Sequence, residues 1–134
     1  MIRALGAGIC YAAIVFAAGF VAGTIRELVF VPWLGRMAGI VIELPLMLGV
    51  SWAACGWIID RLARPLSFAD RALMATSAFI ALMSAELATA VLLFHQQAEA
   101  FFRSFADLAG ALGLAGQIVF AGMALLRRPQ ASKS

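Results

Sequence analysis

Four long apolar runs, separated by short segments that hold most of the charged residues, form the hydropathy pattern of this chain. Within each run the apolar residues are nearly continuous, so the run has no broad polar face. A helix needs about 20 such residues, at about 1.5 Å each, to cross a hydrocarbon core of about 30 Å. The pattern therefore predicts four transmembrane helices, over residues 4–25, 37–59, 72–94 and 108–126.

The composition agrees with a lipid-embedded protein rather than a water-soluble one. Hydrophobic residues make up 64% of the 134 residues and charged residues 13%, whereas a soluble domain carries about 25% charged residues. So little charge leaves too few polar side chains to cover a globular surface. We therefore expect an all-α integral membrane bundle of four transmembrane helices, forming one domain over residues 1–134. Its main partner is the lipid bilayer, and residues 127–134 form a basic cytoplasmic tail.

The basic residues divide unequally between the two ends of the predicted helices. One side holds Arg3, Arg61, Arg64, Arg71, Arg127, Arg128 and Lys133, and the other holds Arg26, Arg36 and Arg103. Because Lys and Arg are enriched in cytoplasmic loops, this asymmetry predicts that both termini lie in the cytoplasm. The basic residues form no patch interleaved with aromatic residues, so nucleic-acid binding is not expected.

The connection after the first run, from Arg26 to Arg36, is too apolar for an ordinary loop. We expect it to dip into the membrane interface, with Trp33 at headgroup depth. Proline lacks a backbone N–H and clashes with the preceding helical turn. Pro32 is therefore expected to prevent a continuous helix through this segment.

The connection before the fourth run contains three charged residues spaced by four, Glu99, Arg103 and Asp107, with phenylalanines between them. This spacing predicts a short helix at the interface, with its aromatic side toward lipid. The letters Ser-Phe-Ala-Asp occur at 67–70 and again at 104–107, before the third and fourth runs. Each is expected to act as a capping box, in which the serine accepts from a free backbone N–H.

Four polar residues, one from each predicted helix, form the most specific feature of the sequence: Arg26, Glu43, Glu86 and Gln117. Glu43 lies at a depth of about 9 Å from the outer helix end, Glu86 at about 12 Å and Gln117 at about 14 Å, counted at about 1.5 Å per residue. A charged residue inside a bilayer costs about 2.5–3.5 kcal/mol and usually faces a partner in the bundle. We expect Arg26 to reach Glu43 or Glu86, and Gln117 to donate hydrogen bonds.

Two interpretations of this cluster stay open. It is either a polar knot that fixes how the helices pack, or a site that binds a proton or a cation. Pro45 follows Glu43 by two residues and leaves the carbonyl of Val41 without its usual partner. That carbonyl is a possible cation ligand, but a tolerated helix kink is the expected role of Pro45.

Several residues carry a family resemblance. The run Gly23-Thr24-Ile25-Arg26, then Pro32 and Gly35, then Glu43-Leu44-Pro45-Leu46-Met47 resembles a family of uncharacterised small bacterial inner-membrane proteins. The likeness covers most of the chain. It implies four helices and location in a bacterial inner membrane, and it carries no known activity.

Small residues offer smooth surfaces for close packing of helices. Gly19 and Gly23 are spaced by four in the first run, and Gly110, Gly113 and Gly116 lie in the fourth. They are expected to let helices approach closely within one chain, although a homodimer or a larger membrane complex can use the same surfaces.

The chain lacks the usual signatures of an enzyme. It has one histidine, no Gly-x-Ser-x-Gly elbow and no nucleotide-binding loop, and Cys10 and Cys55 have no metal-ligand spacing. We therefore expect no catalytic residues, no metal and no cofactor. The sequence favours a structural or accessory membrane subunit. The alternative is a small proton- or cation-coupled transporter that acts as a homo-oligomer.

Overall fold

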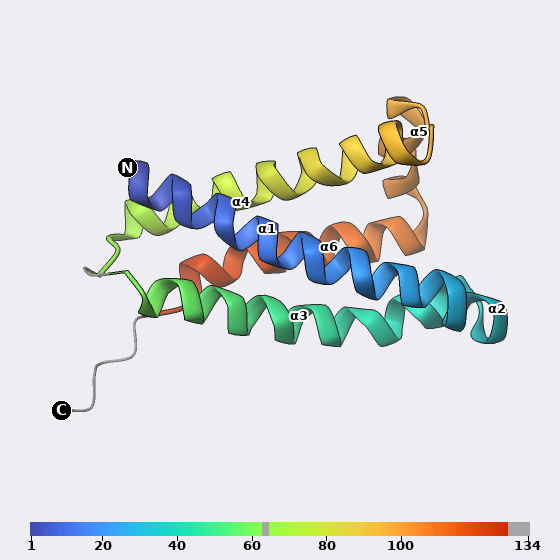
Figure 1. The fold of residues 1–134 in the computed structure, drawn as a ribbon, viewed down its shortest axis with the longest axis horizontal. Helices are drawn as coiled ribbons and strands as arrows, with labels where there is room; N and C mark the ends of the chain where they lie inside the picture. Colours follow the sequence, from blue (N-terminus) through green and yellow to red (C-terminus); the bar gives the residue numbers. More distant parts are fainter. Residues whose placement is uncertain (63–64, 129–134) are drawn as a thin grey trace.

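The computed structural model describes residues 1–62 and 65–128, and the regular elements of this part are all helical. Four long helices make up the body of the molecule: α1 (Ile2–Ile25), α3 (Arg36–Asp60), α4 (Phe68–Ala88) and α6 (Leu108–Leu126) (Figure 1). All four are long and apolar enough to cross a membrane. The predicted all-α membrane bundle is therefore confirmed. Arg64, Lys133 and most of the expected tail lie outside the described residues.

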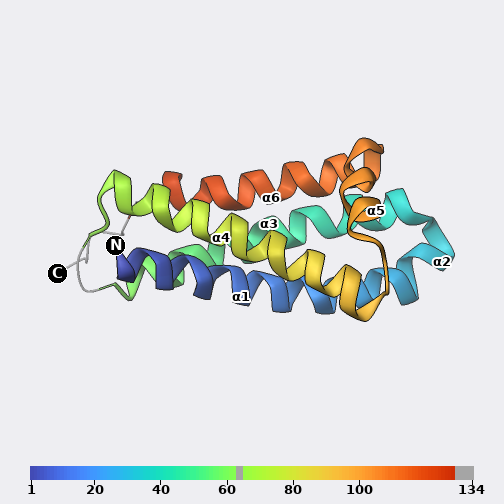
Figure 2. The ribbon, with the colours of Figure 1, turned by 90° about the horizontal axis from the view of Figure 1, so that it is seen from above.

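Five short elements extend or join these helices. A π-helical turn, η1 (Arg26–Phe30), and a single turn, α2 (Val31–Leu34), continue α1, and a second π-helical turn, η2 (Thr89–Leu93), continues α4. A short helix α5 (Ala98–Arg103) and a 3₁₀ turn η3 (Ser104–Ala106) precede α6. Figure 2 shows that the α5–η3 segment crosses the end of the bundle between α4 and α6.

The four long helices form a ring in which α1 and α6 each pack against both α3 and α4. The N-terminus, the end of α3, the start of α4 and the end of α6 lie at one end of the bundle, called here the termini end (Figure 1). The opposite end carries α2 and α5 and is called here the α2/α5 end. Because α1 and α4 both start at the termini end, they run parallel, and α3 and α6 return antiparallel to them.

The closely packed core lies in the half of the bundle nearer the termini end. Most of its members come from the first two-thirds of α1, the second half of α3, the first part of α4 and the end of α6. Tyr11, Cys55, Met74, Ala78 and Ala124 have no exposed surface. Gly8 allows this packing, because a Cβ added there would lie 2.0 Å from Ser77 Oγ and 2.6 Å from the Met74 carbonyl oxygen. The tightest helix contact therefore joins α1 to α4 near the termini end.

The prediction that Pro32 prevents a continuous helix is wrong. The chain stays helical from Ile2 to Leu34, and the break comes at Gly35, whose φ of 84° favours glycine. Pro32 lies in the first turn of α2, where a missing N–H is tolerated. The preceding π-helical turn, Arg26–Phe30, changes the hydrogen-bond register just before the proline.

The two expected capping boxes have different outcomes. The one at 67–70 is confirmed: Ser67 Oγ accepts from the Asp70 backbone N–H, and an Asp70 side-chain oxygen accepts from the Ser67 backbone N–H. This cap also explains why α4 begins four residues before the predicted start. The second box is wrong, since Ser104 lies in η3 and its hydroxyl donates to the Phe101 carbonyl. Asp107 itself is the N-cap of α6 and accepts from the Gly110 backbone N–H at 2.7 Å.

The expected close packing through the glycines of α1 and α6 holds at only some of them. An added Cβ at Gly116 would lie 2.8 Å from Leu44 Cδ1, so α6 approaches α3 closely there. A Cβ added at Gly113 would meet no other described residue within 4 Å, and one added at Gly19 or Gly23 would have its nearest neighbour at 3.4 or 3.8 Å. These three glycines, like Gly116, line a cavity.

Candidate functional site: an acidic cavity between the four helices

The half of the bundle nearer the α2/α5 end is hollow. It contains a cavity of about 890 Å³, partly open to the surface, that is lined by all four long helices, by both π-helical turns and by the α5–η3 segment. The floor of this cavity includes Ser51 and Phe120, which belong to the packed half of the bundle. All four residues of the expected polar cluster, Arg26, Glu43, Glu86 and Gln117, line it.

Arg26 and Glu43 form an ion pair between η1 and α3. Arg26 NH1 lies 2.5 Å from Glu43 Oε2, and the two side chains are 26% and 14% exposed. Gly39 makes room for this contact, because an added Cβ would lie 2.8 Å from Arg26 Cγ. Residues 39 and 43 are one helical turn apart on α3, so the stem of Arg26 crosses Gly39 while its guanidinium reaches Glu43.

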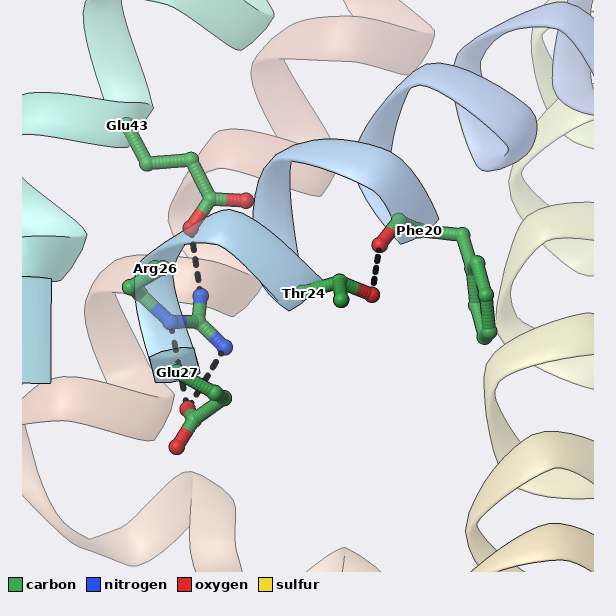
Figure 3. A network of polar contacts seen from close by, with 5 residues as sticks. All are labelled: Phe20, Thr24, Arg26, Glu27 and Glu43. Carbon is green, nitrogen blue, oxygen red and sulfur yellow. Dashed lines mark hydrogen bonds and ion pairs between the residues drawn. The ribbon is translucent and has the colours of Figure 1, made fainter. Parts of the chain in front are cut away.

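A second carboxylate, Glu27, also contacts Arg26. Its Oε1 accepts from Arg26 Nε at 3.3 Å and from Arg26 NH2 at 3.2 Å. Figure 3 shows the guanidinium between the Glu43 and Glu27 carboxylates. The positive charge of Arg26 is thus shared by two acids, one on α3 and one on its own helical turn. Glu27 was not among the residues expected from the sequence.

Glu86 and Gln117 form the other pair, between α4 and α6. Gln117 Nε2 donates a hydrogen bond to Glu86 Oε2. This orientation leaves Gln117 Oε1 as a buried acceptor that has no hydrogen-bond partner within the described part of the chain. Within the same residues, no Lys, Arg or His nitrogen lies within 4.0 Å of the Glu86 carboxylate. Glu86 therefore differs from Glu43 in lacking a basic partner.

The two pairs are close neighbours at the contact between α3 and α6. Gly116, which precedes Gln117, packs against Leu44, which follows Glu43. Arg26 contacts Glu43 rather than Glu86, and Gln117 donates to Glu86. The arrangement is therefore two adjacent pairs around one cavity.

Pro45 does not contribute to the cavity. Helix α3 runs through it from Arg36 to Asp60, and both Pro45 and Val41 are exposed on the outer surface of the bundle. Neither residue is part of the cavity lining. The idea that the free Val41 carbonyl binds a cation beside Glu43 is therefore not supported by the structure, and the helix kink at Pro45 stays a prediction.

Aromatic side chains form part of the cavity wall, a feature that was not among the expectations from the sequence. Phe16 and Phe20 come from α1, Phe94 follows η2, and Phe101 and Phe105 come from the α5–η3 segment. Phe101 and Phe105 pack edge to face with centroids 5.2 Å apart. They were predicted to face lipid, but both line the cavity. The signal that was available is their spacing of four, which puts both rings on one side of the segment.

Both π-helical turns lie at the level of the cavity. Arg26, Glu27 and Leu28 of η1 line it, as do Thr89 and Ala90 of η2. A π-helical turn has a different angular step from an α-helix, and such turns often occur at functional sites. In η1 the turn brings Arg26 and Glu27, adjacent in sequence, to the same cavity.

The chemistry open to this site is limited by its donor set. Within the described residues, no group of three His, Cys, Asp or Glu side chains is arranged to hold a metal ion. What the cavity does contain is carboxylate and amide oxygen next to apolar and aromatic walls. Such a site can accept hydrogen bonds and can balance a positive charge.

Comparison with models of known protein families, with curated proteins and with solved structures finds no match for this chain. The resemblance expected from residues 23–47 therefore stays an expectation. Any function has to be argued from the cavity itself.

Proposed function

We propose that this chain is a small membrane transporter that binds a cation in the cavity, with the Glu86 carboxylate as its principal acceptor. The observation that carries the proposal is the isolation of Glu86, a cavity-lining acid whose only described hydrogen bond comes from the neutral amide of Gln117. Burying a carboxylate without a basic partner is costly. A bound proton or cation would reduce that cost.

The charges around the cavity also favour binding of a cation. The charged side chains of its lining are Arg26, Glu27, Glu43 and Glu86, with a formal net charge of −2. Because Glu43 and Glu86 are only partly exposed and lie beside apolar side chains, their field is screened less than it would be in water. A cation would be drawn in, and an anion would be repelled.

The asymmetry of the bundle is consistent with one state of an alternating-access cycle. The α2/α5 end is hollow and the half at the termini end is closed by packed side chains such as Tyr11 and Met74. Transport requires a second state in which the closed half opens. In a protein of four helices, we expect that change to occur within a homo-oligomer.

The transport proposal is tested by flux into proteoliposomes, with a pH-sensitive dye for protons and with isotopically labelled monovalent cations, both metal ions and organic ammonium ions. Wild-type protein should conduct one of these ions, and E86Q and E43Q should lose the flux while keeping their thermal stability in detergent. The control is E99Q, because Glu99 lies on α5 and pairs with Arg103 rather than lining the cavity. Equal flux in wild-type protein, E86Q and empty vesicles would overturn the proposal.

A structural or accessory role is the second candidate, and one specific observation favours it. The Arg26–Glu43 pair joins the α1 side to α3, and the Glu86–Gln117 pair joins α4 to α6. Two such contacts can fix how the helices pack without binding anything. This role predicts that E86Q and R26Q lower thermal stability. It also predicts that the chain co-purifies with a larger membrane complex in mild detergent.

We further propose that the protein lies in a bacterial inner membrane with both termini in the cytoplasm. The support is the excess of arginine at the termini end, where Arg3, Arg61, Arg71, Arg127 and Arg128 lie. A fluorescent protein fused after residue 134 should fluoresce in bacterial cells, while an alkaline phosphatase fusion at the same place should be inactive. Active phosphatase there would reverse the proposed orientation.

A further inference from the structure

The cavity has a specific surplus of hydrogen-bond acceptors beside Glu86. An ionised carboxylate can accept about four hydrogen bonds, and the described residues supply Glu86 with one, from Gln117 Nε2. Since the Gln117 amide points its nitrogen at Glu86, its Oε1 is left as a buried acceptor with no partner among the residues that the structure describes. A buried acceptor with no donor destabilises the structure that contains it. The site therefore needs N–H or O–H donors as well as positive charge.

The walls of the cavity indicate what else the ligand carries. Five phenylalanines, Phe16, Phe20, Phe94, Phe101 and Phe105, line it together with aliphatic side chains, so the wall of the cavity is mainly apolar and partly aromatic. A bare metal cation takes six or more oxygen ligands in the case of Ca²⁺ and keeps its waters in the case of Mg²⁺, and aromatic walls supply neither. An apolar group in the ligand fits these walls. The cavity volume of about 890 Å³ is in the range of cavities that hold small organic molecules.

We propose that the cavity binds a protonated primary or secondary amine with an aromatic or branched apolar body, whose N–H groups donate to Glu86 and to Gln117. This inference rests on the proposed function and names its substrate class. The ammonium lies between the Glu86 carboxylate and the Gln117 amide, whose oxygen turns toward it. The apolar body lies toward the α2/α5 end, against Phe101 and Phe105.

The acceptor chemistry distinguishes this ligand from other cations. A quaternary ammonium has the same charge and can lie over an aromatic ring, but it has no N–H to donate. A neutral alcohol has a donor but no charge to balance Glu86. Of these three head groups, only the protonated amine supplies both, so a matched series of three compounds with the same apolar body separates the effect of charge from that of hydrogen-bond donation.

The experiment measures binding by calorimetry to the detergent-purified protein with 3,3-diphenylpropylammonium, its trimethylammonium analogue and 3,3-diphenylpropanol. The primary amine should bind, and each of the other two should bind at least about tenfold more weakly, since a hydrogen bond to a charged group contributes about 1.5–3 kcal/mol. Equal affinity for the trimethyl compound, for the alcohol, or for all three would overturn the inference. Absence of binding by the primary amine would overturn it as well.

Variants provide the second half of the test. E86Q and Q117L should each weaken binding of the primary amine by about tenfold or more, whereas E99Q should bind as wild type does. Because the compound series uses the wild-type protein, the inference stays testable even if E86Q fails to fold. Amine binding without any flux would remove the transport proposal and leave the inference intact. Ion flux that depends on Glu86 without amine binding would do the reverse.

Discussion

The hydroxyl of Tyr11 on α1 donates a hydrogen bond of 2.9 Å to the carbonyl oxygen of Phe120 on α6, and the two rings stack with centroids 4.3 Å apart. These helices lie diagonally across the bundle, so Tyr11 fills the centre of the ring of helices. Its side chain has no exposed surface. Phe120 also lines the cavity, so this contact closes the floor that separates the hollow half from the packed half.

Removal of the Tyr11 hydroxyl should lower stability by a modest amount. Y11F keeps the stacked ring and loses one neutral hydrogen bond, which should cost about 1 kcal/mol in the free energy of unfolding. Y11A removes the ring as well and should cost about 3–5 kcal/mol. Both changes are measured by denaturation in mixed micelles. If Y11F lost as much free energy of unfolding as Y11A, the floor of the cavity would not depend mainly on packing of the Tyr11 ring.

Two glycines of α1 provide a matched pair for the contact with α4. G8A puts a methyl group 2.0 Å from Ser77 Oγ and 2.6 Å from the Met74 carbonyl oxygen, so the helices have to separate. G6A meets nothing within 4 Å, and alanine is the better helix former by about 1 kcal/mol. The melting temperature in detergent should fall in G8A and stay equal or rise in G6A. The same response in both variants would mean that α1 and α4 do not meet at Gly8.

The long helices were predictable because lipid acts as a uniform solvent and fixes the length of an apolar run. Predicted bounds of 37–59 and 108–126 compare with Arg36–Asp60 and Leu108–Leu126. The predictions were wrong where local hydrogen bonding determines how a helix begins or continues. The continuation through Pro32 depends on a π-helical turn, and the cap of α6 depends on whether Ser104 or Asp107 adopts extended backbone. Neither choice is determined by hydropathy.

Gly39 offers a test of how Arg26 is held against Glu43. A leucine at 39 would occupy the space of the Arg26 stem, since even a Cβ lies 2.8 Å from Arg26 Cγ. G39L should therefore reduce stability in the wild-type background and do so much less when R26Q is already present. The expected coupling energy is about 0.5–3 kcal/mol. G49L serves as the control, because nothing lies within 4 Å of Gly49.

The outcome of that double-mutant cycle has a clear alternative. If G39L and R26Q lower stability additively, Arg26 does not lie across Gly39, and the ion pair is not held by α3 in this way. Coupling between G49L and R26Q would instead point to a general loosening of the bundle.

For the site, the sequence indicated which residues are costly in a bilayer but not how they pair. Charge alone did not decide whether Arg26 reaches Glu43 or Glu86; the space over Gly39 does. The cavity was not predictable, because it arises where side chains leave the space between the helices unfilled. The sequence predicted packing surfaces at Gly19, Gly23 and Gly113, yet a Cβ added at Gly113 would meet no other described residue within 4 Å.

The N-cap of α6 gives a prediction that separates the observed cap from the expected capping box. D107A removes the acceptor for the Gly110 backbone N–H and should cost about 1 kcal/mol, within the usual range for an N-cap. D107N keeps an acceptor oxygen and loses the charge, which faces Arg36 at 4.0 Å on the exposed surface. It should therefore cost only a few tenths of a kcal/mol.

S104A should also have a small effect, because the Ser104 hydroxyl donates to the Phe101 carbonyl and caps nothing on α6. Unfolding free energies of the three variants check this order. If S104A proved as destabilising as D107A, the helix would start from Ser104 after all, and the α5–η3 segment over the cavity would have to be placed differently.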